Sequence, residues 1–306
     1  MTRWLITGAG GMLGRDLVAA LTEPTASYGR HARRSETPVE ITAATRDMLD
    51  VTDAAAVASA VSGHDIVINA AAWTDVDAAE DHEDVATDIN GRAVNNLAAA
   101  CTVNGAKLIQ ISTDYVFDGT GTKPYPETHP TAPINAYGRG KVLGEQLALR
   151  TGGYVVRTAW LYGDHGPNFI ATMLKLAASR PTVDVVTDQI GQPTWTAALA
   201  EQLVRLGTAA LAGTAAPGIY HGTATGQASW HDLARTLYDL AGLDPDRIRP
   251  TTAESFARPA PRPAYSVLGH DAWTAAGIPP QPDWRVQLDH ALSEPGFADL
   301  AKAARS

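Results

Sequence analysis

Cysteine is almost absent from this sequence of 306 residues. The single cysteine, Cys101, cannot form a disulfide within the chain, which fits a protein of the reducing cytoplasm. It lies in the alanine-rich stretch "NNLAAACTVNG", where helical spacing predicts a small buried side chain and not a nucleophile. We therefore expect a cytoplasmic protein whose chemistry does not use a thiol.

Long apolar runs and excess positive charge are also missing. No stretch approaches the roughly 18–20 apolar residues of a membrane-spanning helix, and the first apolar run, "WLIT", is too short for a signal peptide. Lysine and arginine number 24 against 33 acidic residues, giving a formal net charge of −9. This balance opposes nonspecific binding to nucleic acid or to an anionic membrane, but it allows a small anionic ligand in a local pocket.

Two further site types find no support in the sequence. The nine histidines are scattered, and no His or Cys cluster has the spacing of metal ligands. Nothing resembles the nucleophile elbow of a Ser–His–Asp hydrolase.

Short buried strands alternate with helical segments over the first half of the chain. The expected strands are 3–7, 39–45, 65–72, 107–113 and 153–163, and the expected helices are 15–23, 53–63, 85–104 and one that starts near 135. Such alternation predicts an α/β fold built on a doubly wound parallel sheet with helices on both faces.

A glycine pattern follows the first expected strand. Gly8, Gly11 and Gly14 have the spacing G-x-x-G-x-x-G, and a helical pattern begins directly after them. Glycines permit a tight turn and a close approach of the backbone to a pyrophosphate, and the helix N-terminus offers free N–H groups. The pattern therefore predicts a Rossmann-type sheet that binds a dinucleotide.

The end of the second expected strand bears on which dinucleotide binds. Many NAD-binding folds place an acidic residue there for the ribose hydroxyls. This chain has Arg46 instead, which could pair with a 2′-phosphate and favours NADPH, with NADH as the alternative. A solvated surface arginine is the simpler reading of Arg46. Asp50 is a candidate for the adenine edge, although it could equally be a structural cap.

Residues suited to proton transfer gather near the fourth expected strand. Ser112, Thr113 and Asp114 lie at its carboxyl end, the edge at which ligands bind in open α/β sheets. Tyr137 and Lys141 follow, four residues apart, so they share one face of the next helix. A nearby positive charge favours the phenolate and makes tyrosine a better proton donor at neutral pH. Tyr-x-x-x-Lys alone is common by chance; the hydroxyl before it is what strengthens the reading.

The sequence changes character after about Gly163. The segment from Arg258 to Pro282 is rich in proline, but its prolines alternate with Trp, Tyr and Leu, which favour burial. We expect an NAD(P)-binding domain over residues 1–160 and a smaller, mainly substrate-binding region over residues 161–306, which packs over the edge of the sheet. Later segments are expected to return to the first domain.

Together, the glycine pattern, Asn69-Ala-Ala, Thr113 and the Tyr137–Lys141 pair resemble the extended short-chain dehydrogenase/reductase superfamily. Narrower stretches, "STDYVFDG", "DQIGQPT" and "RPAYSVL", occur in the order seen in the dTDP-4-dehydrorhamnose reductase family. The resemblance runs from Trp4 to about Leu268.

The resemblance implies roles for individual residues. Tyr137 would be the general acid for the C4 oxygen of the sugar, Lys141 would lower the tyrosine pKa and hold the nicotinamide ribose, and Thr113 would bond the carbonyl. The implied cofactor-binding residues are Gly8, Gly11, Met12, Leu13, Gly14, Arg46, Asp50, Val51, Ala70, Ala71, Ala72, Tyr137 and Lys141. The implied substrate-binding residues are Thr74, Val76, Asp114, Tyr115, Trp160, Asn168 and Arg262.

Two of these substrate roles have simple alternatives. Trp160 could stack on thymine, although a tryptophan at a strand end is usually part of the core. Arg262 could hold a diphosphate bidentately, or it could be a surface arginine in a proline-rich loop.

The function implied is NADPH-dependent reduction of the C4 keto group of dTDP-4-dehydro-6-deoxy-L-mannose to dTDP-L-rhamnose, the last step of dTDP-rhamnose biosynthesis. Two alternatives stay open: a related nucleotide-sugar 4-ketoreductase of a deoxysugar natural-product pathway, and a non-catalytic, cofactor-binding regulatory subunit. Thr113-Asp114-Tyr115 lacks the acid pair that dehydratases of the superfamily commonly carry there.

The sequence also departs from the family in two places. Some members bind magnesium at a dimer contact through glutamates, but the corresponding positions here are Asp16 and Ala197, so we predict no such metal site. The resemblance leaves a homodimer open. Tyr265 replaces a usual asparagine, which puts the identity of the sugar in question.

Overall fold

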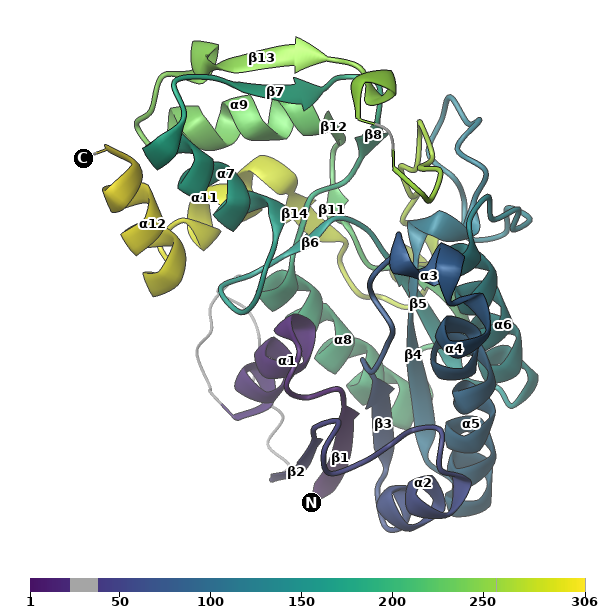
Figure 1. The fold of residues 1–306 in the computed structure, drawn as a ribbon. Helices are drawn as coiled ribbons and strands as arrows, with labels where there is room; N and C mark the ends of the chain where they lie inside the picture. Colours follow the sequence, from purple (N-terminus) through teal and green to yellow (C-terminus); the bar gives the residue numbers. More distant parts are fainter. Residues whose placement is uncertain (23–37, 257, 306) are drawn as a thin grey trace.

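The computed structural model describes residues 1–22, 38–256 and 258–305. Its centre is a six-stranded sheet with the strand order β2-β1-β3-β4-β5-β10, in which every pair is parallel (Figure 1). The strands are β1 (Thr2–Thr7), β2 (Val39–Ala44), β3 (Ile66–Asn69), β4 (Lys107–Thr113), β5 (Tyr154–Thr158) and β10 (Gly218–His221). The predicted α/β fold with a Rossmann-type parallel sheet is confirmed.

Helices cover both faces of this sheet, as buried parallel strands require. Along β1, Trp4 and Ile6 belong to the core beneath α1 (Met12–Thr22) and α8 (Thr196–Leu211). Leu5, between them, belongs to the opposite core beneath α2 (Ala54–Val61) and α5 (Ala93–Asn104). α6 (Ala136–Arg150) completes this second face. Glu23, the expected last residue of the first helix, lies outside the described residues.

The expected helix 85–104 contains a wider turn. It consists of α4 (Glu83–Thr87), the π-helical turn η1 (Asp88–Arg92) and α5, and the short α3 (Ala78–Asp81) precedes it. Gly91 in η1 lies directly against α6, because a Cβ there would come within 2.8 Å of Leu143 Cδ2. Single π-helical turns inside α-helices are frequent at functional sites.

The expected strand 153–163 is wrong as a single element. The chain forms β5, leaves the sheet, and then forms the short β6 (Leu161–Tyr162). Trp160 between them has φ +47°, in the left-handed region that interrupts an extended strand.

Much of the second half surrounds a core of its own, drawn above the sheet in Figure 1. Its helices are α7 (Phe169–Ser179), α9 (Trp230–Leu240), α11 (Trp284–Ala291) and α12 (Pro295–Arg305). Its strands pair as β7 (Val183–Val186) with β13 (Ile248–Thr251), β8 (Ile190–Gly191) with β12 (Ala228–Ser229), β6 with β9 (Thr194–Trp195), and β11 (Ala224–Thr225) with β14 (Gln281–Asp283).

The remaining elements are short helices: η2 (Asp114–Val116), η3 (Pro245–Arg247), η4 (Ala253–Ser255) and α10 (Asp271–Ala275). Trp273 of α10 is fully buried in the core beneath α1 and α8. Within the described part of the chain, no helix has both the length and the apolar character needed to cross a membrane.

Candidate active site

A cleft of about 1630 Å³ lies at the carboxyl ends of the sheet strands. The segments that follow β1, β3, β4 and β5 line it from the sheet, and the 164–167 loop and Trp230 line it from the second half. A pocket for one drug-sized ligand usually has about 300–1,000 Å³. This cleft therefore has room for a dinucleotide and a second ligand.

The glycine turn forms one end of the cleft. Gly8 has φ +67°, which favours glycine, and the Gly11 N–H donates to the Gly8 carbonyl at 3.0 Å. A Cβ on Gly14 would lie 2.3 Å from that carbonyl oxygen, so the first turn of α1 packs directly on the loop. The bare backbone of Gly10 and Gly11 lines the cleft at the helix N-terminus. This arrangement fits a pyrophosphate.

Arginines stand next to this turn. Arg46 lines the cleft as predicted, and so does Arg15, which the sequence reasoning missed although it directly follows Gly14. Asp50 lines the cleft too, and its Oδ1 accepts from the Thr52 N–H at 2.9 Å and the Thr52 hydroxyl at 2.7 Å. These two bonds, followed by the nearby Arg46, lower the Asp50 pKa. Asp50 is thus a turn-forming residue at the cleft wall.

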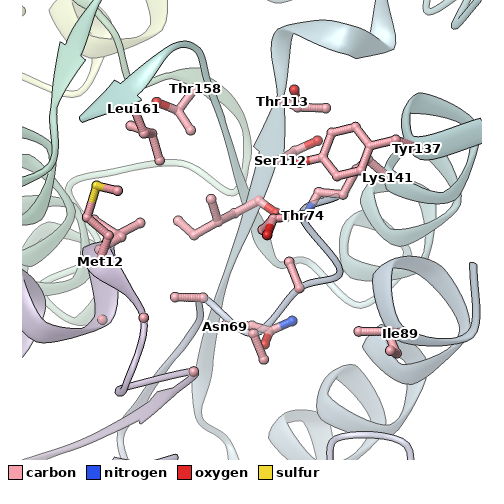
Figure 2. A pocket seen from close by; sticks show the side chains of 18 of the residues that line it. Met12, Asn69, Thr74, Ile89, Ser112, Thr113, Tyr137, Lys141, Thr158 and Leu161 are labelled. Atoms are coloured by element: carbon pink, nitrogen blue, oxygen red, sulfur yellow. Dashed lines mark hydrogen bonds between the residues drawn. The ribbon is translucent and has the colours of Figure 1, made fainter. Parts of the chain in front are cut away.

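The proton-transfer residues meet above the end of β4 (Figure 2). Asn135 caps α6 by accepting from the Gly138 N–H at 2.8 Å, which places Tyr137 in the first turn. The Tyr137 phenol lies next to the Thr113 side chain, whose hydroxyl donates to Asp114 Oδ1 at 3.0 Å and accepts from the Tyr115 N–H at 3.1 Å. One turn later, Lys141 Nζ donates to the Ile111 carbonyl at 2.7 Å. The spacing of four residues therefore does bring phenol, hydroxyl and ammonium to one corner of the cleft.

Burial dominates the titration of this corner. It raises the Tyr137 pKa, and Asp114 and Tyr115 raise it further, while the Thr113 hydrogen bond lowers it. Burial also lowers the Lys141 pKa to about 8, with the Glu145 carboxylate opposing that change. Asp114 is buried as well, and burial raises its pKa to about 6 against hydrogen bonds from Ser266 and Thr113. The expected lowering of the tyrosine pKa by Lys141 stays a prediction.

The other end of the cleft has an aromatic wall. Trp160 stacks on Trp230 with ring centroids 3.6 Å apart and an angle of 8° between the planes. Sequence reasoning missed Trp230; the only signal was its position directly after Ser229, the N-cap of α9. Trp230 covers one face of Trp160, and Gly191 packs against the same ring, because a Cβ there would lie 2.6 Å from Trp160 Cε2. These two contacts leave little of the Trp160 ring free for stacking on a base.

Two expected substrate residues do not line the cleft. Asn168 caps α7 by accepting from the Ala171 N–H at 3.0 Å, and its amide donates to the Gly163 carbonyl at 2.8 Å. The Arg262 guanidinium is hydrogen-bonded to the Asp77 carboxylate and to the Ala260 carbonyl. The other expected cofactor and substrate residues all line the cleft: Gly8, Gly11, Met12, Leu13, Gly14, Arg46, Asp50, Val51, Ala70, Ala71, Ala72, Thr74, Val76, Thr113, Asp114, Tyr115, Tyr137, Lys141 and Trp160.

Three residues outside the cleft bear on the remaining predictions. Cys101 is buried, and burial raises its thiol pKa to about 12. Asp16 is half-buried, and burial raises the pKa of its carboxyl. In residues 1–22, 38–256 and 258–305, no three His, Cys, Asp or Glu side chains stand close enough to hold a metal ion. Tyr265 contacts Gln227, at 3.3 Å, and does not line the cleft.

Comparison with known proteins gives the family. The model of the RmlD substrate binding domain family matches residues 2–296. The chain belongs to this family. The dTDP-4-dehydrorhamnose reductase of Streptomyces griseus is 52% identical to this chain. The match covers 95% of this chain and 93% of that protein. The dTDP-4-keto-6-deoxy-D-glucose reductase of Streptomyces niveus is 48% identical to this chain, over 95% of this chain and 96% of that protein.

A solved structure of a relative supports the fold. The dTDP-4-dehydrorhamnose reductase of Bacillus anthracis, in complex with NADP, superposes with a TM-score of 0.84 and is 35% identical, covering 95% of this chain and 99% of that one. The family resemblance expected from the sequence is confirmed.

Proposed function

We propose that this RmlD-family protein reduces the C4 keto group of dTDP-4-dehydro-6-deoxy-L-mannose with NADPH and releases dTDP-L-rhamnose. The observation that carries the proposal is the Streptomyces griseus reductase, 52% identical across nearly the whole chain. The cleft geometry agrees, because a phenol, a hydroxyl and an ammonium group meet beside a glycine turn that fits a dinucleotide.

NADPH, when bound, supplies the hydride for C4. Tyr137 donates its proton to the C4 oxygen as negative charge develops there. The Thr113 hydroxyl, which lines the cleft beside Tyr137, bonds the same oxygen and orients the carbonyl. Lys141 holds a positive charge below this oxygen and bonds the nicotinamide ribose. In this way the residues of β4 and α6 move the proton and direct the keto group.

The remaining cleft residues divide between the two ligands. The glycine turn holds the pyrophosphate of the cofactor, and Arg46 bonds its 2′-phosphate. Thr74, Val76, Asp114 and Tyr115 contact the dTDP-sugar. Trp160 contacts the thymine ring at its end of the cleft. The reaction belongs in the cytoplasm, where NADPH is available and the lone Cys101 stays reduced.

A second candidate is a 4-ketoreductase of a related nucleotide sugar. Two relatives favour it: the Streptomyces niveus reductase at 48% identity and a probable dTDP-4,6-dihydroxy-2-methyloxan-3-one 4-ketoreductase of Streptomyces antibioticus at 46%. The difference between the candidates is the sugar and not the chemistry at C4. The relatives from Streptomyces griseus and Streptomyces niveus are both named as reductases, which speaks against a purely regulatory subunit.

Separate assays with the two sugars distinguish the two candidate functions. The protein is given NADPH and either dTDP-4-dehydro-6-deoxy-L-mannose or dTDP-4-keto-6-deoxy-D-glucose, and NADPH oxidation is followed by absorbance. We expect the first sugar to have the higher kcat/KM, with dTDP-L-rhamnose identified as the product by NMR. A higher kcat/KM for the second sugar would move the function to the second candidate. Tyr137→Phe is the inactive control for both.

A further inference from the structure

A charged network lies buried behind the wall of the cleft, where α6 packs on β4 and β5. The Glu145 carboxylate is 3% exposed and accepts from the Ser112 hydroxyl at 2.6 Å and from Arg157 Nε at 2.8 Å. Its second oxygen accepts from Arg157 Nη2 at 2.7 Å, so the pair is bidentate. Arg157 is 1% exposed and also lies over the Phe117 ring. Neither charged side chain lines the cleft.

The network continues the proton-transfer face of α6. Tyr137, Lys141 and Glu145 follow one another at intervals of four residues, so they lie along one side of the helix. That side contacts three consecutive residues at the end of β4. Lys141 Nζ donates to the Ile111 carbonyl, Glu145 accepts from the Ser112 hydroxyl, and Tyr137 stands next to Thr113. Arg157 then ties the same helix face to β5. These contacts hold α6 against β4 and β5, and so they hold Tyr137 in its position next to Thr113.

We propose that Glu145 is the positioning residue of this site: its buried carboxylate, held by Arg157 and Ser112, keeps Lys141 charged and holds α6 in register with the end of β4. The inference takes the proton-transfer role of Tyr137 and Lys141 from the proposed function. It adds a residue that contacts neither sugar nor cofactor.

The electrostatic part of the proposal follows from burial. Moving an ammonium group out of water favours its neutral form, and burial alone lowers the Lys141 pKa. The Glu145 carboxylate is the charge that acts against this effect. Without Glu145, Lys141 and Arg157 would be two buried cations with no anion between them. Lys141 would then lose its proton at a lower pH.

The other ionisable groups around this face do not replace Glu145. His221 of β10 stands 3.4 Å from Arg157, and burial followed by the Arg157 charge lowers its pKa to about 3, so it stays neutral. α5 brings no charged side chain. Four charged groups on the elements packed against α6 have other partners: Asp114 of η2 acts on Tyr137, Asp88 and Arg92 of η1 pair with each other, and Glu83 of α4 pairs with Arg139. The remaining charged groups on these elements are Asp84 of α4, Lys107 of β4, Asp81 of α3, and Glu80 of α3, which accepts from the Ala136 N–H.

A direct titration of Lys141 tests the proposal. Protein labelled with ¹³C at the lysine Cε carbons is followed by NMR against pH, and the Lys141 signal is assigned with Lys141→Arg. We expect a midpoint of about 8 in the unaltered protein. In Glu145→Gln the midpoint should fall by about one pH unit or more, because the carboxylate that favours the charged form of Lys141 is lost. An unchanged midpoint would overturn the proposal.

Controls deal with folding and with nonspecific effects. Glu145→Gln leaves Arg157 buried without its partner. The double variant Glu145→Gln/Arg157→Gln removes that unpaired guanidinium, and the Lys141 midpoint should again fall. Glu83→Gln is the matched control, because it removes the partner of Arg139 on the exposed side of α6 and should leave the Lys141 midpoint unchanged.

Activity separates this inference from the proposed function. If the protein reduces a nucleotide sugar, the alkaline limb of its kcat/KM profile should move to lower pH in Glu145→Gln by the same amount as the Lys141 midpoint. A shifted midpoint in a protein that reduces neither sugar would overturn the proposed function alone. An active protein whose midpoint and alkaline limb both stay in place would overturn only the role of Glu145.

Discussion

Residues 1–160 and residues 161–305 contribute to the cleft in different ways. In the first part, the expected residues sit on short local units: the glycine turn after β1, the end of β4 and the first turns of α6. In the second part, Asn168 and Arg262 serve as a helix cap and an ion-pair partner, whereas the unexpected Trp230 lines the cleft. Where a site residue belongs to a turn or a helix start, the local backbone geometry determines where its side chain lies. A single side chain that depends on a distant partner is far harder to place.

The largest effect should come from the first part, at the proton donor. Tyr137→Phe removes the phenolic proton but keeps the ring, so kcat should fall by roughly 10²–10⁴-fold, as for a lost general acid. NADPH affinity, measured by fluorescence titration, should barely change. Near-normal turnover would show that Tyr137 is not the proton donor. The proton-transfer chemistry could then no longer be assigned to residues 1–160.

The glycine turn gives the next largest effect. In Gly14→Ala the new Cβ would lie 2.3 Å from the Gly8 carbonyl oxygen, so the loop must move. We expect a loss of about 1–3 kcal/mol in the free energy of unfolding and a clear weakening of NADPH binding. Gly10→Ala is the matched control for stability, because its Cβ would meet nothing closer than Thr45 Cγ2 at 3.6 Å. Equal thermal stability of the two variants would contradict the packing argument.

Arg46 tests the cofactor preference. Arg46→Gln removes a charged hydrogen-bond donor, and such bonds contribute about 1.5–3 kcal/mol. The Kd for NADPH should therefore rise by about tenfold or more, while the Kd for NADH stays the same. Arg3→Gln, which removes an exposed pair with Glu40, serves as the control. If both cofactors weaken equally, Arg46 does not contact the 2′-phosphate.

The smallest effect is expected in the second part. Asn168→Ala removes the cap of α7 and should cost about 1 kcal/mol of unfolding free energy, measured by denaturant titration. kcat and the KM for the sugar should stay unchanged, and Asn168→Asp, which keeps an N-cap acceptor, should restore most of the stability. A large rise in KM instead would return Asn168 to the substrate site and weaken the contrast between the two parts.

Much of the fold could be predicted because the strands of a parallel sheet alternate regularly with helices in sequence. What could not be predicted depends on distant contacts or on one dihedral angle. Nothing in "GIYH" (Gly218–His221) says that this strand pairs with β5. Nothing in the apolar run 153–163 reveals that the backbone turns at Trp160.

The same distinction applies to the site. The motif residues Thr113, Tyr137 and Lys141 could be placed because strand end and helix start are adjacent in the chain. The Glu145–Arg157 pair was missed, although an arginine within the apolar stretch "GYVVRTAW" is a usable signal of a buried partner. Which carboxylate it meets depends on how α6 lies across β4 and β5.

The return of β10 to the sheet governs when the site can form during synthesis. A ribosome that has delivered residues 1–160 has supplied the glycine turn, Tyr137 and Lys141, but only five of the six strands. The face beneath α1 still lacks α8, and with it Leu199, Leu203 and Leu206 of the core. That apolar surface is covered only after α8 has emerged, and Trp273 and Ile278 complete it later still. The nascent chain thus contains the glycine turn, Tyr137 and Lys141 well before α8 and β10 complete the sheet that supports them.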